Sequence, residues 1–236
     1  MSAFTLSAAE WDVLRLSVKV ALGATLLILP LGVFMGYLLA RREFRGRTIV
    51  EILITLPLVM PPVATGLILL LLLGRESIVG GWLERAFGIR FVFNTKGAVV
   101  AAAVVSFPLL VKAAQLAFSG VDPRLEGAAR TLGAGRVRTF FAVSLPLAWP
   151  GVAAGLVLAF ARCLGEFGAT IVFAGNVAGR TRILPLAMYN AYQSPDGMGE
   201  ATRLLVLSVL IASAALVAGT WLDRRGKKKL GRMDAS

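Results

Sequence analysis

Long apolar stretches separated by polar connections dominate the chain. A helix rises ~1.5 Å per residue, so a helix that crosses ~30 Å of hydrocarbon needs about 20 apolar residues. Five stretches meet this requirement, and the pattern predicts an all-α membrane protein with five transmembrane helices. The predicted spans are Val13–Ala40, Val50–Leu73, Gly97–Phe118, Leu147–Ala174 and Leu204–Leu222. The polar connections are 41–49, 74–96, 119–146 and 175–203.

These spans divide the chain into a short N-terminal segment (1–12), a transmembrane domain (13–222) and a basic tail (223–236). The N-terminal segment has no Lys or Arg, and the first apolar stretch is longer than that of a signal peptide and ends in Arg41-Arg42. A cleaved signal peptide has a basic start and a shorter apolar region. We therefore expect the first span to be retained.

The basic residues are distributed unevenly between the two ends of the spans. The connections 41–49 and 119–146, with Lys112 and the tail, carry 15 of the 25 Lys and Arg residues. Connections rich in Lys and Arg usually stay in the cytoplasm, so the N-terminus is expected outside and the C-terminus inside. A basic tail can also bind nucleic acid, but here a topological anchor is the simpler interpretation, and no nucleic-acid partner is expected. A single orientation further predicts that two copies pair about an axis along the membrane normal.

Composition excludes most catalytic chemistry. The chain is 57% hydrophobic and 16% charged, with a net charge of +12, one Cys and no His. Without His there is no Ser-His-Asp triad, and one Cys cannot form a zinc cluster. Gly226-Lys227 is the only Gly-Lys pair, and Trp221 stands where a P-loop needs its first Gly. We expect no catalytic residue, no metal site and no ATP site in this chain.

The second span contains a helix-breaking pattern. A proline inside a helix removes a backbone donor, and adjacent prolines at membrane depth should break the helix. Broken backbone at this depth is tolerated inside protein or beside a watery cavity. The pattern predicts a gate or path wall, although a kink that improves packing is the alternative. The residues concerned are Thr55, Pro57, Pro61, Pro62 and Thr65.

Arg162 and Glu166 place two charges in the fourth span, four residues apart. Charges in mid-membrane are costly and usually face the bundle interior, where they mark function. We expect Glu166 to be paired and near the path without binding an anion itself. The alternative is an ion pair that only fixes helix packing.

Small residues at a spacing of four predict close helix contacts. They occur at Gly32 and Gly36 in the first span and at Gly151 and Gly155 in the fourth.

The 119–146 connection has a sequence ordered enough to fold. Asp122-Pro123 provides a cap and a helix-starting proline, and a short helical stretch follows as far as Gly133. An amphipathic run at 136–141 then predicts a segment at the membrane face. Ala128 and Ala129 leave a flat surface for a partner, unless this is an ordinary interfacial helix.

The loop resembles the EAA motif of bacterial ABC-importer permeases. Gly127-Ala128-Ala129, Gly133, Val143 and Leu145-Pro146 have the spacing of that motif. Gly127 replaces the motif's Glu, and a carboxylate lies one step earlier. The resemblance implies a type I ABC-importer permease fold whose coupling helix docks on a cytoplasmic ATPase subunit. The coupling residues would be Glu126, Gly127, Ala128, Ala129, Arg130 and Gly133.

Other segments are similar to the oxyanion permeases for molybdate and sulfate. They are 56–63, 103–109, 164–170 and 173–176. The five-span layout resembles the molybdate members more closely. With these segments, the expected path or gate comprises Thr55, Pro57, Pro61, Pro62, Thr65, Ser106, Glu166 and Thr170.

The resemblance implies the permease subunit of an ATP-driven importer for a tetrahedral oxyanion, molybdate or tungstate, in the inner membrane of a bacterium or archaeon. Its partners would be a second copy, two ATPase subunits that carry ATP and Mg, and an extracytoplasmic oxyanion-binding protein. Two alternatives are a sulfate or thiosulfate importer and a stand-alone channel or secondary transporter.

Overall fold

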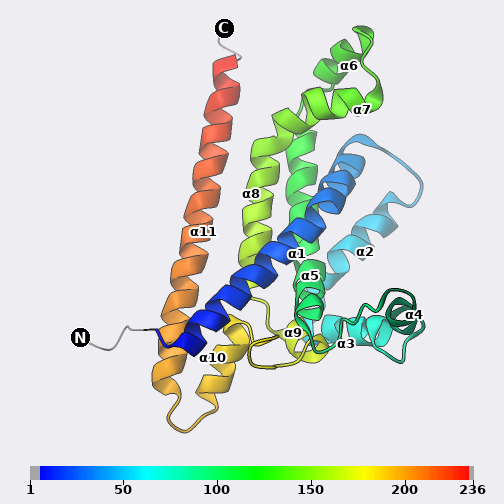
Figure 1. Cartoon of the computed structure of the whole chain (residues 1–236). Coiled ribbons are helices and arrows are strands. Elements are labelled where there is room, and N and C mark those ends of the chain that lie inside the picture. The colour runs from blue at the N-terminus through cyan, green and yellow to red at the C-terminus, as the bar shows by residue number, and fades with distance from the viewer. Residues whose placement is uncertain (1–5, 234–236) are drawn as a thin grey trace.

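The computed structural model describes residues 6–233, with side chains as far as Trp221. The first five residues of the predicted N-terminal segment, and the side chains of the predicted basic tail, lie outside the described residues. Four long apolar helices could cross a membrane, and a bent pair of shorter helices brings the number of candidate spans to five. The long helices are α1 (Ala8–Arg41), α5 (Thr95–Ser119), the continuous stretch Arg136–Leu164 and α11 (Met198–Met233) (Figure 1).

The remaining elements are short helices and turns that connect or interrupt these spans. They are α2 (Arg47–Val59), α3 (Pro62–Leu73), α4 (Ile78–Phe87), α6 (Pro123–Thr131), α9 (Gly168–Phe173) and α10 (Leu184–Tyr192). The continuous stretch Arg136–Leu164 itself consists of α7 (Arg136–Thr139), the π-helical turn η1 (Phe140–Ser144) and α8 (Leu145–Leu164).

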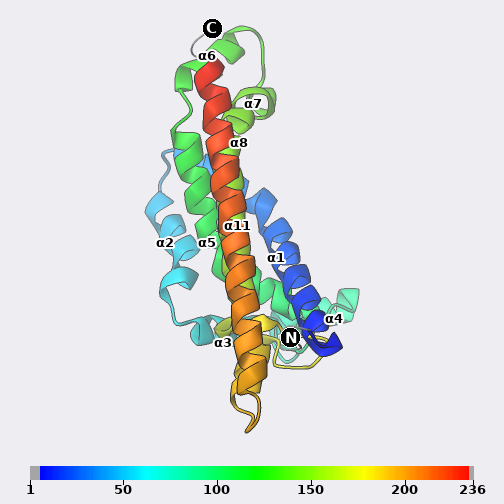
Figure 2. The ribbon, with the colours of Figure 1, turned by 90° about the vertical axis from the view of Figure 1, so that its left-hand side faces the viewer.

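Helices α1, α5 and α8 all contact one another, and small residues bring the backbones of α1 and α8 close to α5. A Cβ atom on Gly36 of α1 would lie 2.5 Å from the Cβ of Ala114, and one on Gly155 of α8 would lie 2.5 Å from the Cβ of Ala113. Added Cβ atoms on Gly32 and Gly151 would also meet α5 side chains at under 3 Å. The predicted close contacts are therefore confirmed, and α5 is their common partner. Helix α11 packs along α8 (Figure 2).

The fourth span differs from its prediction. The expected helix ran from Leu147 to Ala174, whereas the continuous helix begins at Arg136 and ends at Leu164. Gly165 caps α8, and the chain then turns into the short helix α9. The apolar sequence continues across the turn, and for this reason hydropathy alone predicted one long span.

Polar contacts join α1 to the last two helices at the end opposite α6. Glu10, in the first turn of α1, forms a capping box with Ser7 and an ion pair of 2.9 Å with Arg203 of α11. Ser17 accepts a hydrogen bond from the backbone N–H of Leu184 at 2.7 Å, which anchors the start of α10. Hydropathy predicted neither α10 nor α4, because both are short helices within polar connections.

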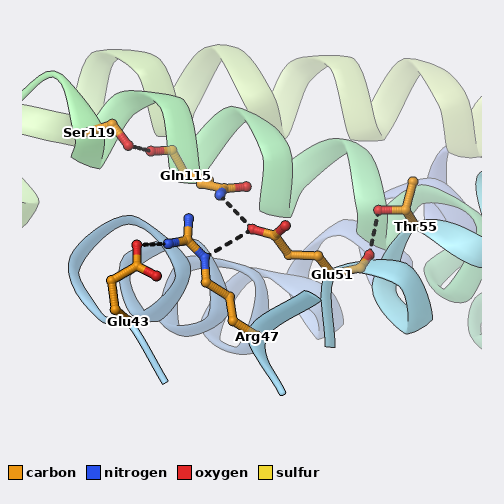
Figure 3. Close-up of polar contacts among 6 residues, drawn as sticks. All are labelled: Glu43, Arg47, Glu51, Thr55, Gln115 and Ser119. Carbon is orange, nitrogen blue, oxygen red and sulfur yellow. Dashed lines mark hydrogen bonds and ion pairs between the residues drawn. The ribbon is translucent and has the colours of Figure 1, made fainter. Parts of the chain in front are cut away.

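A polar cluster in the N-terminal part of α2 reaches α5 (Figure 3). Arg47 pairs with Glu43 and Glu51, and Glu51 accepts a hydrogen bond of 3.1 Å from the side chain of Gln115 on α5. No residue of α2 is fully buried. This helix therefore leaves most of its apolar surface uncovered within the chain.

The contact at Gly36 generates a first prediction. In Gly36→Ala the new Cβ would also lie 2.9 Å from the backbone N of Gln115, so no side-chain rotation relieves the overlap. We expect a loss of about 1–3 kcal/mol in stability, seen as a lower melting temperature of the purified protein. Gly120→Ala is the control, because its Cβ would meet only ordinary contacts at 3.6 Å or more. Equal melting temperatures for the two variants would contradict the packing argument.

Candidate functional site

The second span breaks between α2 and α3. The chain bends by 115° from α2 to α3, at Met60 and Pro61. The carbonyl of Pro61 accepts the backbone N–H groups of Ala64 and Thr65 at 2.9 and 3.2 Å, so the second helix starts afresh from the first proline. Pro62 occupies the first turn of α3. The break predicted at the adjacent prolines is confirmed, and Pro57 lies within α2 without interrupting it.

The broken parts of the second and fourth spans pack against each other. A Cβ on Gly168 would lie 2.7 Å from the Cβ of Pro62, and one on Gly66 would lie 2.7 Å from the carbonyl oxygen of Ala169. Helices α3 and α9 thus approach at backbone distance. The structure brings together Pro61, Pro62 and Thr65 on one side and Glu166 and Thr170 on the other.

Glu166 lies in the turn between α8 and α9 and is 1% exposed. One carboxylate oxygen, Oε1, accepts the backbone N–H of Ala169 at 2.8 Å. The other, Oε2, lies 2.9 Å from Nη1 of Arg162, outside hydrogen-bond geometry. The predicted pairing of Glu166 is therefore confirmed, and its carboxylate also caps the start of α9.

Two hydroxyl groups beside this turn are buried without a partner. Neither Oγ1 of Thr65 nor Oγ1 of Thr170 has a hydrogen-bond partner among the described residues. Buried polar groups are normally satisfied, and an unsatisfied one costs about 1–3 kcal/mol. The junction of α3 and α9 therefore holds polar groups that this conformation of the single chain does not pair.

The remaining two predicted path residues have their hydroxyl groups occupied elsewhere. Thr55 donates to the carbonyl of Glu51 in its own helix at 2.7 Å. Ser106 is buried, and its Oγ lies 3.0 Å from Sγ of Cys163, between α5 and α8. The structure does not bring either hydroxyl to the junction of α3 and α9.

The 119–146 connection forms a second candidate site at the α6 end of the bundle. The Asp122 side chain caps α6, Pro123 starts it, and Gly133 adopts a left-handed φ of 86° just after its end, as predicted. Gly127 and Ala128 are exposed, and the Leu132 side chain is 89% exposed. A surface of small residues beside an uncovered leucine is suited to docking in a groove of another protein.

Glu126 points inward from the same helix. Its Oε1 accepts Nε–H of Arg41 at 3.1 Å and the hydroxyl of Ser144 at 2.7 Å, while Nη2 of Arg41 donates to the carbonyl of Val121 at 2.7 Å. The sequence did not identify Arg41 and Ser144 as its partners. One signal in the sequence could have indicated Arg41 as a partner of Glu126. Arg41 ends a predicted span on the same side of the membrane as the 119–146 connection, which carries the displaced carboxylate.

Together, the bundle with two broken spans and the protruding helical loop define a membrane-embedded subunit of a transport system. The chain belongs to the family described as "Binding-protein-dependent transport system inner membrane component", whose model matches residues 28–228. It is accordingly a multi-pass inner-membrane transport component and not an enzyme.

Relatives cover nearly the whole chain. "Molybdenum transport system permease protein ModB" of Escherichia coli is 50% identical over 223 residues, which is 94% of this chain and 97% of the relative. The Haemophilus influenzae protein of the same name is 47% identical over the same shares. "Molybdate/tungstate transport system permease protein WtpB" of Pyrococcus abyssi is 33% identical, over 92% of this chain and 79% of the relative.

Solved structures support the fold. A bacterial ABC transporter that imports alginate matches with a TM-score of 0.74 at 16% identity, over 93% of this chain and 80% of the other. The MetNI methionine ABC transporter matches with a TM-score of 0.66 at 18% identity, over 92% and 93%.

The buried ion pair generates the second prediction. Arg162→Met leaves the Glu166 carboxylate buried without its cation, so we expect a loss of about 3–5 kcal/mol and a lower melting temperature. Adding Glu166→Gln should restore part of that loss, because the neutral amide oxygen can still accept the N–H of Ala169. If Arg162→Met with Glu166→Gln is no more stable than Arg162→Met alone, Arg162 does not stabilise the charge of Glu166.

Proposed function

We propose that this chain is the permease subunit of an ATP-driven importer for molybdate or tungstate. The observation that carries the proposal is the 50% identity to a molybdenum permease over 94% of the chain. The alignment covers 94% of the chain, so it reaches into both broken spans and the coupling loop. It favours molybdate over the sulfate and thiosulfate alternative, and an ABC importer over a channel working alone.

In this proposal the oxyanion passes beside the junction of α3 and α9. The prolines of the second span and the turn at Glu166 give this region the irregular backbone that lines cavities in membrane proteins. The unpaired hydroxyls of Thr65 and Thr170 are buried in this conformation and become donors for a passing oxyanion when the contact of α3 and α9 opens. Glu166, already paired and capping α9, holds the turn and does not bind the anion. Thr55 and Ser106 reach the path only after α2 or α5 rearranges.

A second copy of the chain completes the path. Helix α2 has no fully buried residue, and its exposed apolar side chains need cover that the bilayer or a partner must provide. They include Ile49, Ile52, Leu53, Leu56 and Val59. Because α2 leads directly to the broken region, pairing along α2 puts the two junctions on either side of one central path.

The dimer generates the third prediction. We expect two copies of the chain per purified transporter, measured as the mass of the intact complex in native mass spectrometry. Leu53→Arg, on the uncovered surface of α2, should shift the complex towards a single copy because it would bury an unpaired charge. Leu116→Arg is the control, since Leu116 is also exposed but lies on α5. A single copy in the unaltered transporter would contradict the proposal.

The coupling loop connects this path to the source of energy. Helix α6 docks on a cytoplasmic ATPase subunit, which carries ATP and Mg, through the exposed Gly127 and Ala128 with Leu132 beside them. Two such subunits close on ATP binding, move both coupling helices and switch the path from inward-facing to outward-facing. This arrangement needs the α6 end of the bundle inside the cell, as the distribution of basic residues favours.

An extracytoplasmic binding protein delivers the anion at the opposite end. The family description itself refers to binding-protein-dependent transport. One structural neighbour is an alginate ABC transporter in complex with a periplasmic protein that holds its substrate, at a TM-score of 0.73. Selection by the binding protein allows the permease path itself to bind the anion weakly.

Reconstituted uptake is the test of this function and the fourth prediction. The purified transporter, with its ATPase subunits and binding protein in liposomes, should accumulate labelled molybdate only with ATP, and excess sulfate should not compete. Equal competition by sulfate would assign the chain to the sulfate importers. Uptake without the ATPase subunits would identify a channel or secondary transporter.

The variant Ala128→Arg tests the coupling role of α6 in the same uptake assay. Ala128 is exposed within the chain, so the variant should keep its melting temperature. Its bulk and charge should prevent α6 from docking and should reduce ATP-driven uptake by at least tenfold. Unaltered uptake would remove Ala128 from the docking surface.

A further inference from the structure

A groove separate from the α3–α9 junction runs along the half of α1 that ends near α6. It encloses about 1000 Å³ between α1 on one side and α6, α7, η1 and the start of α8 on the other. Both walls lie at the same end of the bundle in Figure 1. On α1, Pro30, Val33, Phe34, Tyr37 and Arg41 line it. Their spacing of three or four residues makes one continuous stripe along the helix.

The length of the stripe along α1 is similar to the thickness of one membrane leaflet. The eleven residue steps from Pro30 to Arg41 rise about 16 Å, roughly half of the ~30 Å hydrocarbon thickness. The facing wall is also apolar, with Phe140, Phe141 and Trp149. Phe34 is 57% exposed and Phe141 is 62% exposed, so the chain itself does not fill the space between them.

The end of the groove nearest α6 is strongly basic. Arg41, Arg42, Arg130 and Arg136 line it, against the single acid Glu126, which leaves three net positive charges. Arg41 is already bound to Glu126. Among the side chains that the structure describes, Arg42, Arg130 and Arg136 have no ion-pair partner.

We propose that this groove holds one anionic glycerophospholipid. Its acyl chains would lie against the apolar stripe, and its phosphate would lie between Arg42 and Arg136. Basic pockets between transmembrane helices bind acidic lipid head groups, and guanidinium groups pair with phosphate oxygens in a fixed, often bidentate geometry. Trp149 and Tyr37 are residue types enriched where a membrane meets water.

Other possible occupants match either the apolar stripe or the arginines of the groove less well. A free oxyanion or inorganic phosphate matches the arginines but leaves the apolar depth uncovered. A zwitterionic phospholipid also matches the apolar depth and offers a phosphate, but its cationic amine adds a positive charge beside the three arginines, so it is the weaker fit. An ATPase subunit docked on the exposed side of α6 contacts the head of the groove and cannot extend to Pro30, which lies about 16 Å further along α1.

The bound lipid would connect elements that otherwise share few contacts. Inside the chain, α1 reaches α6 through Arg41 and its two acceptors, Glu126 and the carbonyl of Val121. A lipid phosphate bridging Arg42, which caps the end of α1, and Arg136 on α7 adds a second link between the core of the bundle and the loop. The position of the loop would then depend on the lipid composition of the membrane.

Native mass spectrometry of the intact transporter tests the proposal, and its lipid readout does not depend on transport. The transporter is released from nanodiscs that contain equal amounts of phosphatidylglycerol and phosphatidylcholine. We expect about one phosphatidylglycerol retained per chain, in preference to phosphatidylcholine. The variant Arg42→Gln with Arg136→Gln should retain phosphatidylglycerol on the order of tenfold less.

The matched control is Arg45→Gln with Arg138→Gln. It removes the same charge from the same loop and the same helix, but neither residue lines the groove. This control should retain the lipid, as should the unaltered transporter in millimolar inorganic phosphate. A second variant, Phe34→Gln, should lower retention without changing the charge.

Four results would overturn the proposal. They are no preference for phosphatidylglycerol over phosphatidylcholine, equal loss of lipid in the groove and control variants, displacement of the lipid by inorganic phosphate, and loss of the ATPase subunits from the groove variant with its lipid unchanged. The last would assign the arginines to the ATPase interface. Because none of these results involves molybdate, failure here leaves the proposed transport function to its own test.

Discussion

The close approach of α1 and α8 to adjoining faces of α5 is the constraint on which the rest of the structure depends. In lipid, apolar side chains gain little by moving from lipid to protein, so helices associate through backbone proximity and tight packing. Gly36 and Gly155 meet the adjacent residues Ala114 and Ala113, which places both contacts at one level of α5. These three helices form a tightly packed core, and the broken spans pack beside it.

The broken spans carry most of the candidate path residues. Helices α2 and α3 and the short helix α9 lie beside the core, and they contain the prolines, the unpaired hydroxyls and the turn at Glu166. Their mutual contact rests on Gly66 and Gly168, where a side chain would overlap the opposing backbone. Helix α2 is joined to α5 by the polar cluster of Arg47, Glu51 and Gln115 and buries no residue fully. An element held at its ends and loosely packed between them can change its angle at small cost.

Much of this arrangement could be predicted from sequence because it depends on local chemistry. Adjacent prolines break a helix wherever they occur, the glycine spacing indicates close packing, and Asp122-Pro123 starts a helix by its own capping group. The end of the fourth span could not be predicted in the same way. Residues 165–174 are as apolar as a continuing helix, and the turn depends on Glu166 reaching the N–H of Ala169, a contact that hydropathy does not register. The partners of Glu126 are also long-range, since Arg41 lies 85 residues away.

The carboxylate at Glu126, one step before the position where the motif has Glu, has a physical reason that only the structure provides. Residues 126 and 127 are adjacent on a helix, and their side chains point about 100° apart. A carboxylate at 126 therefore faces Arg41 and Ser144, while Gly127 leaves the exposed side smooth. The inward group attaches α6 to the ends of α1 and η1, and η1 continues into α8. A force applied to the smooth side would thus pass to two of the three core helices as one body, while the loosely held α2 stays free to move against them.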